Sequence, residues 1–165
     1  MEDDYRRWSE KYDLPILAGG WFYVLGRDED LLMENLRLGA RLGSLVHNTQ
    51  IMMDHQDGSL VSDEQVVEIY LRAYETGEAC GCRPTFEVHV NMWSEDFRRI
   101  EKVADLVEKQ GIPFRMTLDH SHVIFKIDNP REQEVFNIRE SIENGDLVLC
   151  LLYTSDAADE WWCGV

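Results

Sequence analysis

The amino-acid sequence predicts an α/β protein built on a parallel β-sheet. Short apolar segments typical of buried strands alternate with longer segments in which apolar residues recur at helical spacing. The strand-like segments begin near positions 14, 45, 85 and 114, and a spacing of about 30 to 40 residues is that of repeated strand–helix units. The chain has 165 residues, of which 44% are hydrophobic and 29% charged. This is the size and composition of one globular domain.

The first strand–helix unit follows an acidic N-terminal segment. Residues 14–18 form an apolar run that is closed by Gly19 and Gly20, which predicts a short buried strand. Residues 28–43 carry leucines on one broad face, which predicts a helix. Acidic residues at its start and arginines near its end suit the helix dipole.

The next two strands enclose a helix with a clear start signal. Residues 45–53 form an apolar run and predict the second strand. Ser62 with Gln65 three positions later has the pattern of a capping box, and Gly77 suits the end of that helix. Residues 85–90 predict the third strand.

The C-terminal part continues the alternation. A helix is expected to begin at Ser94 and to end before Gly111, and residues 114–118 predict a fourth strand. Residues 131–144 have helical spacing, and residues 147–149 form another strand or a loop.

Two architectures fit this order of elements. One is a partial (β/α)₈ barrel with four to five βα units, and the other is a doubly wound sheet. A doubly wound sheet often carries a glycine-rich nucleotide loop after an early strand. The segment from Ala18 to Trp21 has two glycines but not that pattern, which favours the barrel.

Charge and cysteine content narrow the range of partners. Thirty-two acidic residues against 16 basic ones give a formal charge of −16, which disfavours nucleic-acid and anionic-membrane surfaces. The start of the chain lacks the pattern of a signal peptide, and no stretch has the length of a membrane span. The four cysteines, with only Cys80 and Cys82 close together, indicate free thiols in a reducing cytoplasm.

The last sixteen residues differ from the rest of the sequence. The segment from Cys150 to Glu160 resembles the in-frame translation of a transposase-type sequencing adapter. We therefore expect residues 1–149 to form the partial barrel and residues 150–165 to be a non-native tail. A genuine acidic tail is the alternative. On the first interpretation the chain is an inactive fragment of an active parent.

Polar residues cluster at the ends of the third strand and the fourth. In the segment from Phe86 to Asn91, alternation places Glu87, His89 and Asn91 on one side of the strand. An acid inside a parallel strand is buried and needs a partner. Asp119 follows the fourth apolar run directly.

Two further histidines, His120 and His122, follow Asp119. Neighbouring parallel strands lie ~4.8 Å apart, so these groups are expected to converge. Carboxylates with imidazole suit Mn²⁺, Zn²⁺, Co²⁺ or Mg²⁺. Taken singly, Asp119 fits a turn cap and His122 a structural histidine, so the prediction rests on their convergence. His55, in the loop after the second strand, is a weaker substrate-side candidate.

The pattern Glu87-x-His89, then a helix, then Asp119-x-x-His122 resembles the sugar phosphate isomerase/epimerase superfamily, the xylose-isomerase-like barrels. The resemblance spans residues 14–149. It implies that Glu87 and Asp119 are metal ligands and that His122 contacts the metal or the substrate. It also implies that His89 contacts the substrate, whereas His120 and Asn91 have no clear counterpart. The remaining ligands of the family would lie beyond Leu149.

The resulting hypothesis is a divalent-metal-dependent isomerase or epimerase of a sugar, a sugar phosphate or a polyol. Glu87 and His122 are the expected catalytic residues, and proton abstraction beside a metal-bound carbonyl is the expected mechanism. Two alternatives are a non-catalytic α/β binding module and a zinc endonuclease of the same fold. The acidic balance of the chain counts against the endonuclease.

Overall fold

The structure is a computed structural model that describes residues 2–119, 122 and 147–150, the last four as strand backbone. Helices and strands alternate along the chain after an N-terminal helix. In order the elements are α1 (Glu2–Tyr12), β1 (Ala18–Tyr23), α2 (Glu29–Leu42), β2 (Val46–Ile51), α3 (Asp63–Cys80), β3 (Arg83–Val88), the 3₁₀ turn η1 (Trp93–Glu95), α4 (Phe97–Glu108), β4 (Met116–Asp119) and β5 (Leu147–Cys150).

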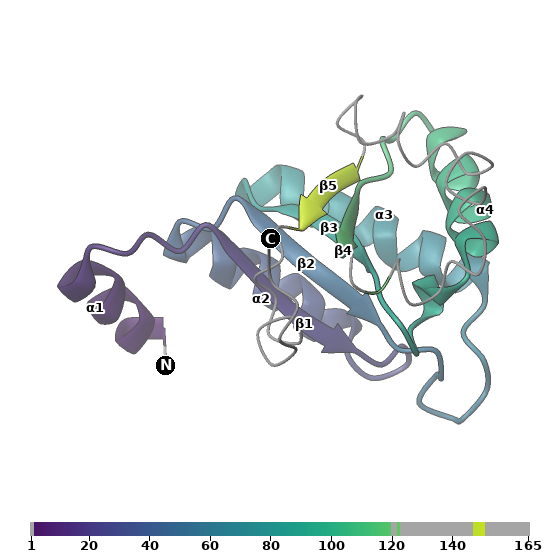
Figure 1. The fold of residues 1–165 in the computed structure, drawn as a ribbon, viewed down its shortest axis with the longest axis horizontal. Coiled ribbons are helices and arrows are strands. Elements are labelled where there is room, and N and C mark those ends of the chain that lie inside the picture. The colour runs from purple at the N-terminus through teal and green to yellow at the C-terminus, as the bar shows by residue number, and fades with distance from the viewer. Residues whose placement is uncertain (1, 120–121, 123–146, 151–165) are drawn as a thin grey trace, which may run out of the picture.

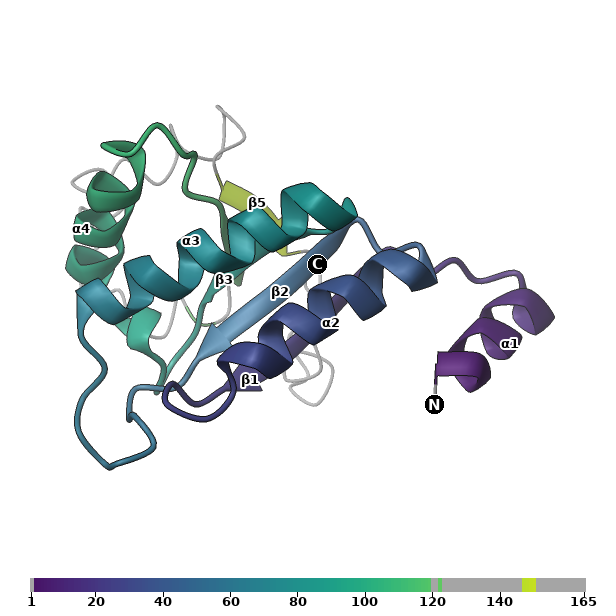
Figure 2. The ribbon, with the colours of Figure 1, turned by 180° about the vertical axis from the view of Figure 1, so that it is seen from behind.

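The five described strands form one parallel sheet in the order β1-β2-β3-β4-β5 (Figure 1). Helices α2 and α3 lie side by side over one face of this sheet, and α4 follows next to α3 (Figure 2). Each new strand is therefore added on the same side of the one before it. A doubly wound sheet would reverse its direction at a switch point, and the described strands do not. The α/β class and the partial (β/α)₈ barrel are thus confirmed.

The core lies between the sheet and these helices. Phe86 of β3, together with Phe114 just before β4, packs against Tyr70 of α3, with ring centroids 5.1 and 4.6 Å from the tyrosine ring. The Tyr70 hydroxyl donates to the carbonyl of Pro113 at 2.7 Å and accepts from the amide of Arg115 at 2.8 Å. These bonds satisfy the buried hydroxyl and hold the segment before β4 against α3.

The first strand is shifted relative to the sequence prediction. It begins at Ala18 instead of occupying residues 14–18, and Leu14 and Leu17 are 66% and 61% exposed. Gly19 and Gly20 lie inside the strand instead of closing it. A Cβ at Gly20 would lie 3.1 Å from the Asn48 carbonyl oxygen. The two glycines therefore allow a close approach of β1 to β2, and this role is invisible in a scan for apolar runs.

Two helix boundaries also differ from those expected. Helix α3 runs past Gly77 to Cys80 and ends at Gly81, whose φ of 86° is the left-handed conformation of a helix C-cap. Helix α4 begins at Phe97, where the Asp96 side chain accepts from the Arg98 amide, and Ser94 belongs to η1. The capping box of Ser62 and Gln65 is confirmed. The helix expected at 131–144 lies outside the described residues.

Helix α1 was not expected, and it stands apart from the sheet (Figure 1). None of its residues is buried, and an ion pair of 3.0 Å between Glu2 and Arg41 joins it to α2. Across the described part of the chain, no helix combines the length and the apolar character needed to cross a bilayer.

Candidate metal centre

The face of the sheet opposite the helices is polar at its centre. Along β2 the buried side chains His47, Thr49 and Ile51 alternate with the half-buried Asn48 and Gln50. The latter two side chains reach across to Glu87 of β3. Thr85, two residues before Glu87, shares a 2.6 Å hydrogen bond with Thr117 of β4. The same face thus carries polar groups from three neighbouring strands.

Three of the expected site residues converge on this face. Glu87 lies near the end of β3, Asp119 is the last residue of β4, and His122 follows one turn later. Each offers one ligand atom, and these atoms all lie within 4.8 Å of one another. Their side chains are buried, with exposed fractions of 2%, 4% and 6%. His122 Nε2 is 3.8 Å from Asp119 Oδ2.

The electrostatics of Glu87 favour a bound cation. Burial raises the pKa of the Glu87 carboxyl, and the nearby charge of Asp119 adds to this. Hydrogen bonds from Gln50 and Asn48 and the charge of His89 lower the pKa, but the net direction is upward. Two buried carboxylates side by side repel each other, and a cation between them would offset both the repulsion and the loss of hydration.

His89 stands next to the cluster. Its ring lies 3.7 Å, centroid to centroid, from that of His122, with 40° between the planes. His89 Nδ1 is 2.7 Å from the carbonyl oxygen of Val90. Because a carbonyl only accepts, Nδ1 carries the proton in this contact. The Phe22 ring of β1 meets the His89 ring edge-on at 6.1 Å.

The other expected residues lie elsewhere. The strand ends at Val88, so the alternation that was expected to bring Asn91 beside Glu87 does not continue. Asn91 is exposed and has a φ of 61°, and its backbone N–H donates to the Glu95 side chain. His55 lies over Gly26 in the neighbouring loop, 3.2 Å from Asp57, and is not part of the Glu87 cluster. His120 lies outside the described residues.

Three residues that contact Glu87 were not among those predicted from the sequence. Asn48 and Gln50 both donate to Glu87 Oε2 from β2, and the Ser94 hydroxyl donates to the Glu87 carbonyl oxygen. The alternation of Asn48 and Gln50 within residues 45–53, a segment predicted from its apolar residues alone, could have identified two of them. A polar residue at every second position of an interior strand marks a polar face.

The donor set fits a divalent metal. Two carboxylates and one imidazole are ligands that Zn²⁺, Mn²⁺ and Co²⁺ accept, and Mg²⁺ accepts the carboxylates. Ligand atoms ~2.1 Å from an ion are at most about 4.2 Å apart, so small inward shifts suffice to close this cluster around one ion. Among residues 2–119 and 122, no other His, Cys, Asp or Glu side chain belongs to a cluster that could hold a metal ion.

No protein-family model matches the sequence, and no curated protein matches it. One solved structure that resembles the chain is described as a 1.8 Å crystal structure of the IolI protein with a bound zinc atom. Its identity is 14% and its TM-score 0.49, and the match covers 70% of this chain and 46% of the IolI chain. The present chain thus spans less than half of that structure, and a similarity this low assigns neither a family nor an activity.

Proposed function

We propose that this chain carries the divalent-metal site of an isomerase or epimerase that acts on a sugar, a sugar phosphate or a related polyol. The observation that carries the proposal is the buried cluster of Glu87, Asp119 and His122. It lies at the carboxyl ends of two adjacent parallel strands, which is where barrel enzymes hold their catalytic groups. The E-x-H and D-x-x-H pattern of the sequence supports the same class.

Glu87 and Asp119 are the proposed anionic ligands, and His122 is either a third ligand or a substrate contact. When bound, the metal supplies a Lewis acid for a substrate carbonyl or hydroxyl oxygen. Mn²⁺, Zn²⁺, Co²⁺ and Mg²⁺ all fit these ligands. The buried position of the three side chains excludes much of the water that would otherwise compete for the ion.

In the proposed mechanism of isomerisation or epimerisation, a proton leaves a carbon next to a carbonyl and returns. Glu87 and His122 are the two proposed groups for this transfer. Burial raises the pKa of Glu87, and a carboxylate with a raised pKa is a better proton acceptor at neutral pH. His89, stacked on His122, is proposed to contact a substrate hydroxyl.

The first test is a calorimetric titration of the chain with Mn²⁺, Zn²⁺ and Co²⁺. Removing a ligand in Glu87→Gln or Asp119→Asn is expected to weaken binding by about 100-fold or more, at the upper end of the loss seen when outer-shell partners are removed. Glu101→Gln, which changes an exposed acid on α4, is the matched control and is expected to bind like the wild type. Unchanged affinity in Glu87→Gln would remove Glu87 from the site.

The second test concerns catalysis. The metal-loaded protein is incubated in D₂O with a panel of aldoses and ketoses, and proton NMR follows both product formation and deuterium uptake at the carbon next to the carbonyl. Uptake that needs both the metal and His122 supports the proposal. Tight metal binding with neither product nor deuterium uptake from any of these compounds would favour the non-catalytic binding module instead.

A further inference from the structure

Two side-chain amides converge on a single oxygen of Glu87. The Nδ2 of Asn48 and the Nε2 of Gln50 both donate to Glu87 Oε2. Asn48 and Gln50 are two residues apart on β2 and therefore point to the same face of the sheet. Neither residue belongs to the candidate ligand cluster.

The two donors leave the oxygens of Glu87 unequal. A carboxylate has about four lone-pair sites, two on each oxygen, and it accepts without donating when ionised. Two N–H groups on Oε2 fill the sites of that oxygen. Oε1 is then the atom left for a cation. A carboxylate without these two donors would turn about its last bond and offer either oxygen, or both, to the ion.

The orientation of the amides is fixed by the same contacts. If the Asn48 side chain were flipped, its own oxygen would face Glu87 Oε2, and two acceptors would meet without a proton between them. In the orientation with Nδ2 toward Glu87, Asn48 Oδ1 is buried and accepts no hydrogen bond from the described residues. An unsatisfied buried acceptor costs ~1–3 kcal/mol. Asparagine at position 48 therefore destabilises the fold relative to an apolar strand residue, which would leave no unsatisfied acceptor.

We propose that Asn48 and Gln50 are positioning residues that hold Glu87 as a single-oxygen metal ligand, with Oε2 bound to β2 and Oε1 presented to the ion. This inference rests on the proposed metal site. It also narrows the mechanism. With one oxygen held by amides and the other by the ion, Glu87 acts as a ligand, and the proton transfer belongs to His122.

Ligand geometry in the wild-type chain gives the most direct test. The chain is labelled with ¹³C at the glutamate side-chain carboxyl, and infrared difference spectra are recorded with and without Zn²⁺. Single-oxygen binding separates the symmetric and antisymmetric carboxylate stretches more widely than two-oxygen binding does. A wide separation that disappears in Glu87→Gln is expected. A narrow separation that disappears in Glu87→Gln would overturn the positioning role and leave the metal site standing.

Substitution tests the two amides themselves. Gln50→Met and Asn48→Val each remove the donor while keeping similar bulk and a residue that strands accept. Each is expected to weaken Co²⁺ binding by about 10- to 100-fold, the usual effect of losing an outer-shell partner, and to change the visible spectrum of bound Co²⁺. Gln110→Met, on an exposed glutamine at the end of α4, is the control and is expected to change neither.

The outcomes separate the two proposals. If Glu87→Gln abolishes binding while both amide variants keep wild-type affinity and spectrum, the positioning role is wrong and the metal site survives. If none of these variants changes binding, both proposals fail. Thermal unfolding of each metal-free variant identifies a change that merely unfolds the protein, and the infrared experiment on the wild type then decides.

Discussion

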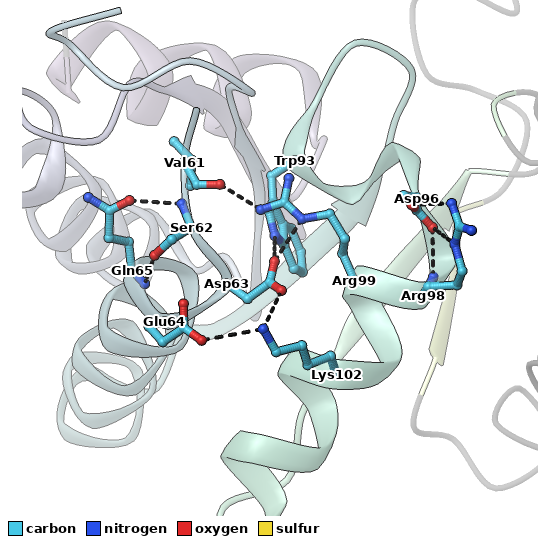
Figure 3. A network of polar contacts seen from close by, with 10 residues as sticks. All are labelled: Val61, Ser62, Asp63, Glu64, Gln65, Trp93, Asp96, Arg98, Arg99 and Lys102. Atoms are coloured by element: carbon cyan, nitrogen blue, oxygen red, sulfur yellow. Dashed lines mark hydrogen bonds and ion pairs between the residues drawn. The ribbon is translucent and has the colours of Figure 1, made fainter. Parts of the chain in front are cut away.

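The carboxylate of Asp63 connects α3 with η1 and α4 (Figure 3). Removing this carboxylate is the sharpest test of the fold. Asp63 is the first residue of α3, and its side chain is 13% exposed. It accepts from Arg99 Nε at 2.7 Å, from Lys102 Nζ at 2.9 Å and from the indole Nε1 of Trp93 at 3.3 Å. Ser94, directly after Trp93, donates to the Glu87 carbonyl oxygen.

The magnitude follows from which groups lose their partner. Without Asp63, the indole N–H of the fully buried Trp93 loses its acceptor, which costs ~1–3 kcal/mol. The charge-assisted bond to Arg99 is worth ~1.5–3 kcal/mol when buried, and less here because the Arg99 side chain is 26% exposed. Lys102 is 54% exposed, so its contact adds little. These losses are not additive, and we expect Asp63→Ala to lower the free energy of unfolding by about 3 kcal/mol.

The loss should depend on pH with a defined sign. Burial raises the pKa of Asp63, but the hydrogen bonds from Lys102, Arg99 and Trp93 outweigh it, so the net pKa is lowered. A carboxyl whose folded pKa lies below its unfolded value of ~3.9 stabilises the fold above that pH. The stabilisation is lost as the pH falls through the lower, folded value. The gap between wild type and Asp63→Ala should therefore be constant from pH 7 to about 5 and close below about 4.

Urea unfolding followed by tryptophan fluorescence, at a series of pH values, measures this gap. Glu64→Ala is the matched control, because Glu64 also contacts Lys102 but is 71% exposed, so its removal should change the free energy of unfolding little. If Asp63→Ala costs no more than Glu64→Ala at pH 7, the network does not hold α3 to α4. A gap that widens in acid would show that the sign assigned to the Asp63 pKa is wrong.

Four further changes test other parts of the fold. Gly77→Ala should lower the free energy of unfolding by roughly 1–3 kcal/mol, because its Cβ would lie 2.6 Å from the Cys82 carbonyl oxygen. Gly39→Ala should cost less than Gly77→Ala in the same urea assay, because its Cβ meets the Cys82 Sγ at 3.3 Å and that side chain needs to move by only a few tenths of an ångström. Ser62→Ala should cost ~1 kcal/mol by removing the confirmed capping box, and a thermal melt that matches the wild type would contradict this. Burial lowers the pKa of His47 to about 4, so the wild type should lose stability as the pH falls from ~6.5 toward 4, and His47→Gln should flatten that part of the curve.

The rhythm of apolar runs was enough to predict the class of fold. Parallel strands buried on the helix side must be apolar at those positions, and the helices between them must carry one apolar face. These requirements act within each segment, so they are readable locally. The start of β1 was misplaced because Gly19 and Gly20 lie within the strand, where they allow β2 to approach closely. A pattern within one segment holds no information about such a contact with another strand.

The candidate site divides in the same way. Glu87, His89, Asp119 and His122 could be selected from sequence, because they interrupt, close or closely follow an apolar run near the end of a strand. Asn91 could not be separated from them, since alternation predicts a side chain's direction only while the strand lasts. The strand ends at Val88, and Asn91, with a positive φ, is exposed.

The sequence by itself determined which elements form and which residue types are available for a metal, because both depend on the order of residues within a segment. The order of the strands, the distances within 4.8 Å that join Glu87, Asp119 and His122, and the two amides from β2 that hold Glu87 were decided only by the tertiary structure. These features arise between segments that are about 30 to 40 residues apart. The distance in space between these segments is set by how the helices pack on the sheet and bring neighbouring strands into register.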